Sequence, residues 1–333
     1  MKLSIGIVGL PNVGKSTLFN ALTKKGVPAE NYPFCTIDPS VGIVPVPDER
    51  LWKLSEFSKS AKTIPAVIEF VDIAGLVAGA SKGEGLGNKF LSNIRETDAI
   101  LHMVRTFHDK DVIHVANRVD PLSDIDIINL ELILADLETV TKRISNLQKD
   151  VKRGDKEALA EEAVLIKVEK VLADSKLANT LDLDTKEQEI LKSMHLLSAK
   201  PMLYSLNTSA ANENVVKEVA AQIPGSYVEI DPVFETGLDD MIKASYKLLN
   251  LETYFTTGED ETRAWTIAAG STAPIAGTAI HNDFKDKFIR AEVVYWQDLL
   301  DAGSYGEARA KGKVKTEGKE YIVKDGDVIE FKI

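Results

Sequence analysis

Residues 9–17 read Gly9-Leu10-Pro11-Asn12-Val13-Gly14-Lys15-Ser16-Thr17, and this stretch decides how the rest of the chain is interpreted. It matches the pattern G-x-x-x-x-G-K-[ST], follows the apolar run 3–8 directly and precedes a plausible helix. In that strand–loop–helix context the pattern forms a phosphate-binding loop, or P-loop. Backbone N–H groups from Asn12 to Thr17 then surround the phosphates, Lys15 reaches the β- and γ-phosphates, and Ser16 binds Mg²⁺. The sequence therefore predicts a nucleoside-triphosphate site.

A second motif, Asp72-Ile73-Ala74-Gly75, ends the apolar run 67–71. A buried strand that ends here delivers the Asp72 carboxylate to the bound metal, and the Gly75 N–H contacts the γ-phosphate. This motif alone is common, and a plain turn is the alternative; the P-loop upstream favours the metal-binding interpretation. Between the two motifs, Thr36 offers a hydroxyl that joins the Mg²⁺ shell when triphosphate is bound. An ordinary surface-loop threonine is its alternative.

The composition is that of a globular protein, with 333 residues of which 44% are hydrophobic and 27% charged. A net charge of −11 argues against attraction of the whole surface to nucleic acid or anionic lipid. No apolar stretch approaches the roughly 20 residues that cross a bilayer, so we expect no membrane association. The single cysteine, Cys35, excludes an internal disulfide, and the first residues lack the pattern of a signal peptide. We therefore expect a cytoplasmic protein.

Apolar runs in residues 1–127 alternate with helix-like stretches, which is typical of an α/β layer with a mainly parallel sheet. The runs 202–206 and 227–230 return to this pattern, and residues 238–249 would form its closing helix. We therefore predict one α/β P-loop domain made of residues 1–127 and 201–262.

The intervening residues 128–200 differ in kind. Apolar side chains recur there at spacings of three and four, which predicts a helix with one apolar seam: Leu137, Val140, Ile144, Leu147 and Val151. The pair Gly154-Asp155 interrupts this helix, and a second helical run follows. The prediction is an antiparallel helical hairpin inserted into the α/β domain.

The last part of the chain, residues 263–333, has strand candidates at 265–267, 291–296 and 328–333 and little helical periodicity. We predict a small α+β module. Its lysines at 311, 313 and 315 would share one face of an extended strand, which suits contact with RNA phosphates. Because residues 263–333 carry as many acidic as basic residues, a solvated surface is an equally weighted alternative.

Together these segments resemble the YchF family of Obg-like ATPases, in the translation-factor-related branch of P-loop NTPases. The resemblance rests on residues 9–17, 31–39, 72–88, 94–97 and 265–333, and so covers nearly the whole chain. It implies a P-loop NTPase domain with a helical insertion and a C-terminal TGS domain of β-grasp type. It also implies ATP hydrolysis in preference to GTP hydrolysis and association with ribosomes. We expect the protein to be a monomer.

Leu76 follows the second motif, at the position where many GTPases carry the glutamine that orients the attacking water. A leucine cannot do this. The family resemblance implies that a histidine from a nearby loop takes the role, and the matching residue is His114. A purely structural histidine is the alternative, and it is the interpretation we give to His102, His108, His195 and His281.

The segment expected to bind the base departs from known patterns. A guanine site carries Asn-Lys-x-Asp after a strand, whereas here the strand candidate leads into Asn207-Thr208-Ser209-Ala210, without a carboxylate at the fourth position. The family pattern resembles Asn-x-x-Glu, which Ala210 does not match either. We expect Asn207 and backbone groups near Thr208 to contact adenine. Residues 231–237 also leave less room than the family usually has for a base-covering loop.

The prediction is thus a Mg²⁺-dependent ATPase that acts as a switch, with the γ-phosphate ordering the segments around Thr36 and Gly75. Asn12 lies where related NTPases use an asparagine to help hold a monovalent cation, so K⁺ is the expected second ion. Two alternatives stay open. One is a GTPase of the same branch, and the other is a ribosome- or RNA-binding module that nucleotide merely gates.

Overall fold

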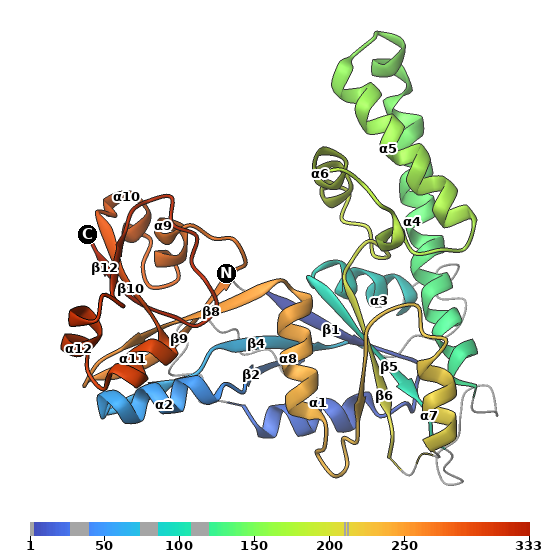
Figure 1. Cartoon of the computed structure of the whole chain (residues 1–333). Coiled ribbons are helices and arrows are strands. Elements are labelled where there is room, and N and C mark those ends of the chain that lie inside the picture. Colours follow the sequence, from blue (N-terminus) through green and yellow to red (C-terminus); the bar gives the residue numbers. More distant parts are fainter. Residues whose placement is uncertain (1–2, 27–39, 74–85, 108–119, 210, 212) are drawn as a thin grey trace.

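The computed structural model describes residues 3–26, 40–73, 86–107, 120–209, 211 and 213–333. Figure 1 shows three parts: a central α/β domain, a helical hairpin that projects from it, and a smaller α/β module that contains the C-terminus. The hairpin and the small module lie on opposite sides of the central domain.

The sheet of the central domain is mixed, with the strand order β2-β4-β1-β5-β6-β7. Neighbouring strands run parallel except at one edge, where β2 is antiparallel to β4. The strands span Ser4–Val8 (β1), Val41–Pro45 (β2), Val67–Asp72 (β4), Ala99–Arg105 (β5), Met202–Asn207 (β6) and Tyr227–Ile230 (β7). Every residue of β5 and β6 is buried, because both faces of a parallel sheet are covered. The predicted mainly parallel sheet is confirmed.

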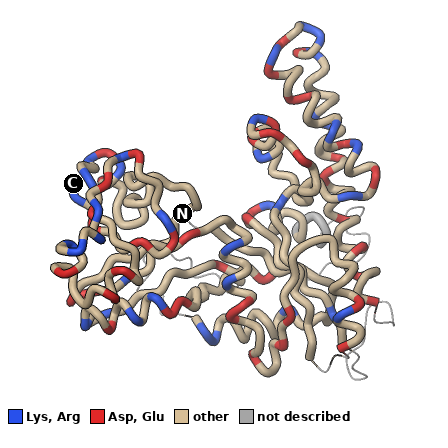
Figure 2. Tube along the Cα trace, viewed as in Figure 1, with Lys and Arg blue, Asp and Glu red and all other residues tan. Residues whose placement is uncertain are grey.

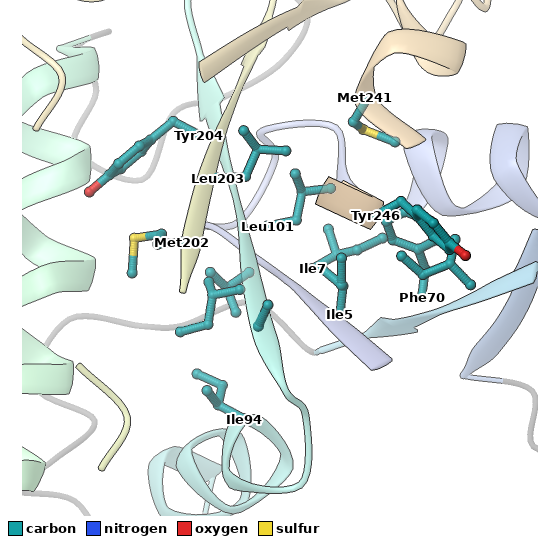
Figure 3. Close-up of a cluster of buried hydrophobic side chains, with 14 of the residues drawn as sticks. Ile5, Ile7, Phe70, Ile94, Leu101, Met202, Leu203, Tyr204, Met241 and Tyr246 are labelled. Atoms are coloured by element: carbon teal, nitrogen blue, oxygen red, sulfur yellow. The ribbon is translucent and has the colours of Figure 1, made fainter. Parts of the chain in front are cut away.

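Helices α1 (Lys15–Lys24), α3 (Leu86–Arg95), α7 (Glu213–Ala220) and α8 (Leu238–Leu248) flank this sheet. In Figure 3 the aliphatic side chains of Leu101 and Leu203 lie on the same side of the sheet as Met241 of α8. Met202 and Tyr204 point to the other side. This alternation along β6 gives each face of the sheet its own half of one continuous core.

The inserted segment forms an antiparallel hairpin of α4 (Pro121–Lys152) and α5 (Lys156–Ala173), as predicted. Gly154 supplies the left-handed turn between them with φ 78°, and the Asp155 carboxylate caps α5 by accepting from the N–H groups of Glu157 and Ala158. The predicted start of the insertion at residue 128 falls inside α4, which begins at Pro121 behind its cap Asp120.

The return from the hairpin to β6 is anchored by one buried carboxylate. The chain passes through a short 3₁₀ turn (Ala178–Thr180) and α6 (Thr185–Ser193). Asp136 of α4, fully buried, then accepts hydrogen bonds from the Leu197 N–H (2.9 Å), the Ser198 N–H (2.7 Å) and the Ser198 hydroxyl (2.6 Å). These bonds fix the base of the hairpin to the strand that follows it.

The second sheet has the order β11-β10-β12-β8-β9-β3. Its strands from the C-terminal part are β8 (Leu251–Thr257), β9 (Glu261–Ala268), β10 (Arg290–Tyr295), β11 (Lys315–Glu317) and β12 (Asp327–Lys332). The helices of the module are α9 (Ala273–Gly277), α10 (Asp283–Lys287), α11 (Trp296–Ala302) and α12 (Tyr305–Ala310). The adjacent, parallel β8 and β12 fit the predicted β-grasp module. The predicted boundary between 262 and 263 falls inside β9, so a division before Leu251 matches this sheet better.

One connection of the central domain joins the second sheet, which the sequence analysis did not foresee. Between β2 and β4 the chain forms α2 (Glu49–Ser58) and β3 (Lys62–Ile64), and β3 pairs in parallel with β9. Arg50 of α2 donates through Nη1 to the Asp325 carboxylate at 2.5 Å. The two sheets are therefore linked through this excursion as well as through the chain at residue 250.

Acidic and basic residues alternate along the trace of the hairpin and of the small module (Figure 2). Within the described ranges, no helix is both long enough and apolar enough to span a bilayer.

Candidate nucleotide-binding site

The predicted P-loop joins the carboxyl end of β1 to the N-terminus of α1. Asn12 and Gly14 both have left-handed backbones, with φ 63° and 102°. Asparagine is one of the few non-glycine residues that adopt this conformation readily. A Cβ at Gly14 would lie 2.6 Å from Nδ2 of Asn207, so only glycine fits there. The turn leads directly into α1, whose first N–H groups are the anion-binding end of a helix.

Lys15 occupies the centre of this loop and is 7% exposed. Its Nζ donates to the carbonyl oxygens of Gly9 and Leu10, both at 2.8 Å. Burial lowers the pKa of Lys15 to about 8, and the Asp72 carboxylate opposes that shift. The loop therefore holds a cation of reduced hydration, which an anionic ligand would stabilise.

Asp72 ends β4, next to β1 in the sheet, and its register partner is Ile7. The side chain is half-buried; burial raises its pKa and the charge of Lys15 lowers it.

Ser16 and Thr17 are exposed in the first turn of α1. The carboxylate of Asp72 and the hydroxyl of Ser16 are oxygen donors of the kind that Mg²⁺ prefers, so this donor set fits the predicted metal. Thr36 and Gly75 lie outside the described residues.

Asn207, 2% exposed at the end of β6, joins the predicted base-binding segment to the P-loop. Its Nδ2 donates to the Val13 carbonyl at 2.9 Å, and its Oδ1 accepts from the Ser209 N–H at 3.1 Å. Thr106, directly after β5, donates its hydroxyl to the Asn207 carbonyl at 2.7 Å. Both polar atoms of the Asn207 amide thus have partners within the protein, whereas the prediction from the sequence was that Asn207, with backbone groups near Thr208, contacts adenine.

Residues 231–237 form a compact turn against this segment. Ser209 donates its hydroxyl to Oδ1 of Asp231 at 2.8 Å. The N–H and the hydroxyl of Thr208 both donate to the Ile230 carbonyl, at 2.8 and 3.0 Å. On the other side, Glu235 lies 3.6 Å from the amine of Lys24. Position 210, where the guanine-reading carboxylate is missing, lies outside the described residues.

The histidine predicted to orient water, His114, also lies outside the described residues. His102 is buried in β5, its ring centre 5.3 Å from that of Tyr204, and burial lowers its pKa to about 3. It is therefore a neutral packing residue near neutral pH. His195 follows α6 in the insertion and His281 precedes α10 in the small module, both away from the P-loop.

Two polar residues, the last residue of β5 and the one that follows it, were not singled out from the sequence. Arg105 is 1% exposed, donates through Nε to the Phe107 carbonyl at 3.1 Å and has its guanidinium 4.5 Å from the centre of the Phe107 ring. Its neighbour Thr106 contacts Asn207 as described above. Their place in the sequence could have indicated them, because both stand where a predicted strand ends. Ligand sites in sheets of this kind lie at the carboxyl ends of the strands.

The predicted extended face of lysines in the small module is wrong. Lys311 is the C-cap of α12, and Gly312 turns the chain with φ 67°. Lys313 pairs with Asp298 at 3.0 Å, and β11 begins only at Lys315. Helix α12 and the left-handed Gly312 that follows its C-cap prevent these lysines from lining up along one strand.

A glycine-shaped loop with a buried lysine, a carboxylate at the end of the adjacent strand and a third loop at the end of β6 together define a P-loop nucleotide-binding protein. Comparisons with known proteins identify the family within this class. Residues 4–135 match a family described as 50S ribosome-binding GTPase, and residues 251–333 match the YchF-GTPase_C family, described as a protein of unknown function.

Relatives match over the full length. Two proteins named ribosome-binding ATPase YchF, from Bacillus subtilis (strain 168) and Escherichia coli O157:H7, are 50% and 48% identical. Those matches cover 100% and 99% of this chain, and 99% of each relative. A solved structure named the Schizosaccharomyces pombe YchF GTPase is 39% identical, with a TM-score of 0.88 over 99% of this chain and 98% of that one. The chain belongs to the YchF family. The predicted family and the predicted class of P-loop nucleotide hydrolase are confirmed.

Proposed function

We propose that this protein is a Mg²⁺-dependent ATPase that works as a switch on ribosomes. The observation that carries the proposal is the buried Lys15, whose amine donates to two carbonyls of the P-loop at the N-terminus of α1. A buried ammonium with a reduced pKa at a helix N-terminus is a site for phosphate groups.

In this proposal the backbone from Asn12 to Thr17 surrounds the β- and γ-phosphates while Lys15 neutralises part of their charge. Ser16 and Asp72, together with Thr36, hold Mg²⁺, which when bound neutralises charge that develops on the phosphate oxygens. Gly75 donates its N–H to the γ-phosphate. His114 orients the attacking water, because Leu76 at the usual glutamine position has no hydrogen-bonding group.

We assign ATP as the substrate rather than GTP. The segment from Asn207 to Ser209 carries no acidic side chain that would pair with the N1–H and 2-amino groups of guanine. The bacterial relatives are named ATPases, whereas the Schizosaccharomyces pombe relative is named a GTPase. A GTPase of the same branch is therefore the competing assignment.

The proposed partner is the ribosome, on the strength of the names of the bacterial relatives. Residues 263–333, which resemble a TGS domain, are proposed to contact RNA through Lys285, Arg290 and Lys315, which are exposed. A cytoplasmic monomer suits this role. In the competing view, nucleotide only gates ribosome binding, and a protein unable to hydrolyse ATP still performs its role.

The test is calorimetric titration with Mg·ATP and Mg·GTP, followed by hydrolysis assays in K⁺ and in Na⁺ at equal ionic strength. We expect ATP to bind at least as tightly as GTP. Lys15→Ala should lose most of this affinity and keep its fold, because a charge-assisted phosphate contact contributes about 1.5–3 kcal/mol. K⁺ should accelerate hydrolysis through Asn12. Tighter binding of GTP by tenfold would transfer the assignment to the GTPase alternative.

A further inference from the structure

The connection between β2 and β4, residues 46–66, leaves the central sheet and returns to it; we call it the excursion. Its strand β3 is an edge strand of the second sheet and pairs in parallel with β9. The N–H of Ala61 donates to the Glu259 carbonyl at 2.8 Å, and the Ser60 hydroxyl donates to the Gly258 carbonyl at 2.7 Å. The excursion is therefore built into the small module, although both of its ends belong to the central domain.

Helix α2 of the excursion adds side-chain contacts at the same junction. Arg50 donates to the Asp325 carboxylate through both of its terminal nitrogens, and its guanidinium carbon lies 5.2 Å from the centre of the Phe255 ring. At the other end of α2, the Thr257 hydroxyl donates to the Ser58 hydroxyl at 2.7 Å. An ordinary surface loop absorbs small displacements of the strands that it joins. The excursion can do so only if it breaks these bonds.

The strands that carry the excursion lead to the nucleotide site. Strands β2 and β4 are antiparallel and form five register pairs, from Val41 to Pro45 on the β2 side. A ladder of that length spans about 17 Å. At its far end the N–H of Asp72 donates to the Ser40 carbonyl at 2.8 Å, and Asp72 is the carboxylate proposed to hold Mg²⁺. One short ladder thus has the proposed metal site at one end and the small module at the other (Figure 1).

Strand β2 is the part of this ladder that can shift most easily. It is the edge of the central sheet and has β4 as its only neighbour among the described strands, whereas β4 lies between β2 and β1. An edge strand is hydrogen-bonded along one side only. Two residues separate β2 from Asp48, the N-cap of α2, and the first of them, Val46, donates its N–H to the Ala66 carbonyl at 2.8 Å. A shift of β2 is therefore passed to α2 and β3.

We propose that the small module responds to the bound nucleotide, because Mg·ATP and Mg·ADP leave β2 and the excursion in different positions and β9 follows its partner β3. This rests on the proposed function, since it concerns the nucleotide that the P-loop binds. Coupling between two sites is reciprocal. A partner that binds the small module therefore changes the relative affinity of the P-loop for ATP and ADP, which adds a means of regulation to the proposed switch.

The test is hydrogen–deuterium exchange of the full chain, saturated with Mg²⁺ and either ADP or a non-hydrolysable ATP analogue. We expect the exchange rates of the amides in β9 to differ between the two nucleotides by about 5-fold or more, the lower end of typical couplings between sites. Helix α5, in the hairpin on the opposite side of the central domain, is the internal reference. Its amides should exchange at the same rate with both nucleotides, which separates the response of β9 from a change in global stability.

Two variants test the route. Arg50→Ala should remove most of the difference in β9, because it breaks both bonds to Asp325. Ser60→Ala removes a bond between the excursion and the turn before β9 and should act in the same direction; it also serves if Arg50→Ala does not fold. The matched control is Arg143→Ala, which breaks a similar pair made through two nitrogens, with Glu161 in the hairpin. This control should keep the difference seen in the wild type.

Equal exchange of β9 in the two nucleotide states of the wild type would overturn the proposal. A difference of the same size in α5 would also overturn it, since the effect would then be global, and so would a difference in β9 that Arg50→Ala and Ser60→Ala both leave intact. The proposed function fails in a separate way. A wild-type protein that binds neither nucleotide in calorimetry would overturn that function.

Discussion

Asn207 donates from its side-chain amide to the carbonyl of Val13 at 2.9 Å, across 194 positions of sequence. This bond ties the end of β6 to the P-loop, so the segment from Asn207 to Ser209 is held next to the loop that is proposed to bind the phosphates. Asn207→Ala removes it and leaves the Val13 carbonyl and the Ser209 N–H without their partners.

We therefore expect Asn207→Ala to lower the free energy of unfolding by about 1–3 kcal/mol, the cost of leaving buried polar groups unsatisfied. The substitution should also lower the affinities for ATP and GTP to the same extent, because the bond holds both loops in place and does not itself contact the base. Urea unfolding and calorimetry measure the two effects. A selective loss of ATP would show that Asn207 contacts adenine directly.

The reduced pKa of Lys15 predicts that ATP binding depends on pH. In the free protein this amine loses its charge above about pH 8, whereas bound phosphates favour the charged form. The part of the apparent ATP affinity that depends on Lys15 should therefore be constant below pH 7 and fall about tenfold between pH 7 and 9. In that range ATP binding should be accompanied by uptake of a proton. Calorimetry in buffers of different ionisation enthalpy detects that proton. Lys15→Ala should abolish both signals, and a pH dependence that persists in the variant would have another source.

His114→Ala tests the proposed orientation of water. Because such a group acts in the transition state and does not bind the ground state, turnover should fall by 10²-fold or more, roughly, while the ATP dissociation constant stays the same. The melting temperature should not change. His281→Ala, in the small module, is the control and should hydrolyse ATP like the wild type. Parallel losses of affinity and rate in His114→Ala would assign it a structural role.

The link between α2 and the small module should be measurable as a coupling energy. Arg50 contacts Asp325 through two nitrogens, and Asp325 also accepts from the Thr253 N–H at 3.0 Å. A double-mutant cycle of Arg50→Ala and Asp325→Ala should give about 0.5–3 kcal/mol of coupling in urea unfolding. The exposed pair Lys53 and Glu49 on the same helix is the comparison, and its coupling should be close to zero. Equal values for both cycles would mean that Arg50 and Asp325 do not stabilise the link.

The P-loop and the strands beside it could be predicted because their signals are local. Gly14 and Lys15 stand at fixed offsets in a short motif, and the continuous apolar run that became β5 is typical of a strand covered on both faces. The seam that includes Val140 and Leu147 indicated α4 in the same way. In each case the residues that decide the structure lie within a few turns or a few positions of one another.

What the sequence did not indicate depends on contacts between distant residues. Nothing near Asp231 shows that its carboxylate will accept from Ser209, and nothing near Asn207 shows that its amide will meet Val13. Strand β3 has three residues, too few for periodicity, and forms only because β9 is there to pair with it. The expected alignment of lysines failed for a local reason, since α12 and the left-handed Gly312 that follows its C-cap were not recognised.

Strand β3 also constrains how the protein is made. Its residue Lys62 pairs with Glu261, roughly 200 positions later, so the partner is still untranslated when β3 leaves the ribosome. At 5–20 residues per second the wait is about 10–40 s. During that interval the nascent chain carries α2 without the surface against which it finally packs. A product truncated near residue 250 would be arrested in the same condition, and the last quarter of the chain is therefore part of what completes the first.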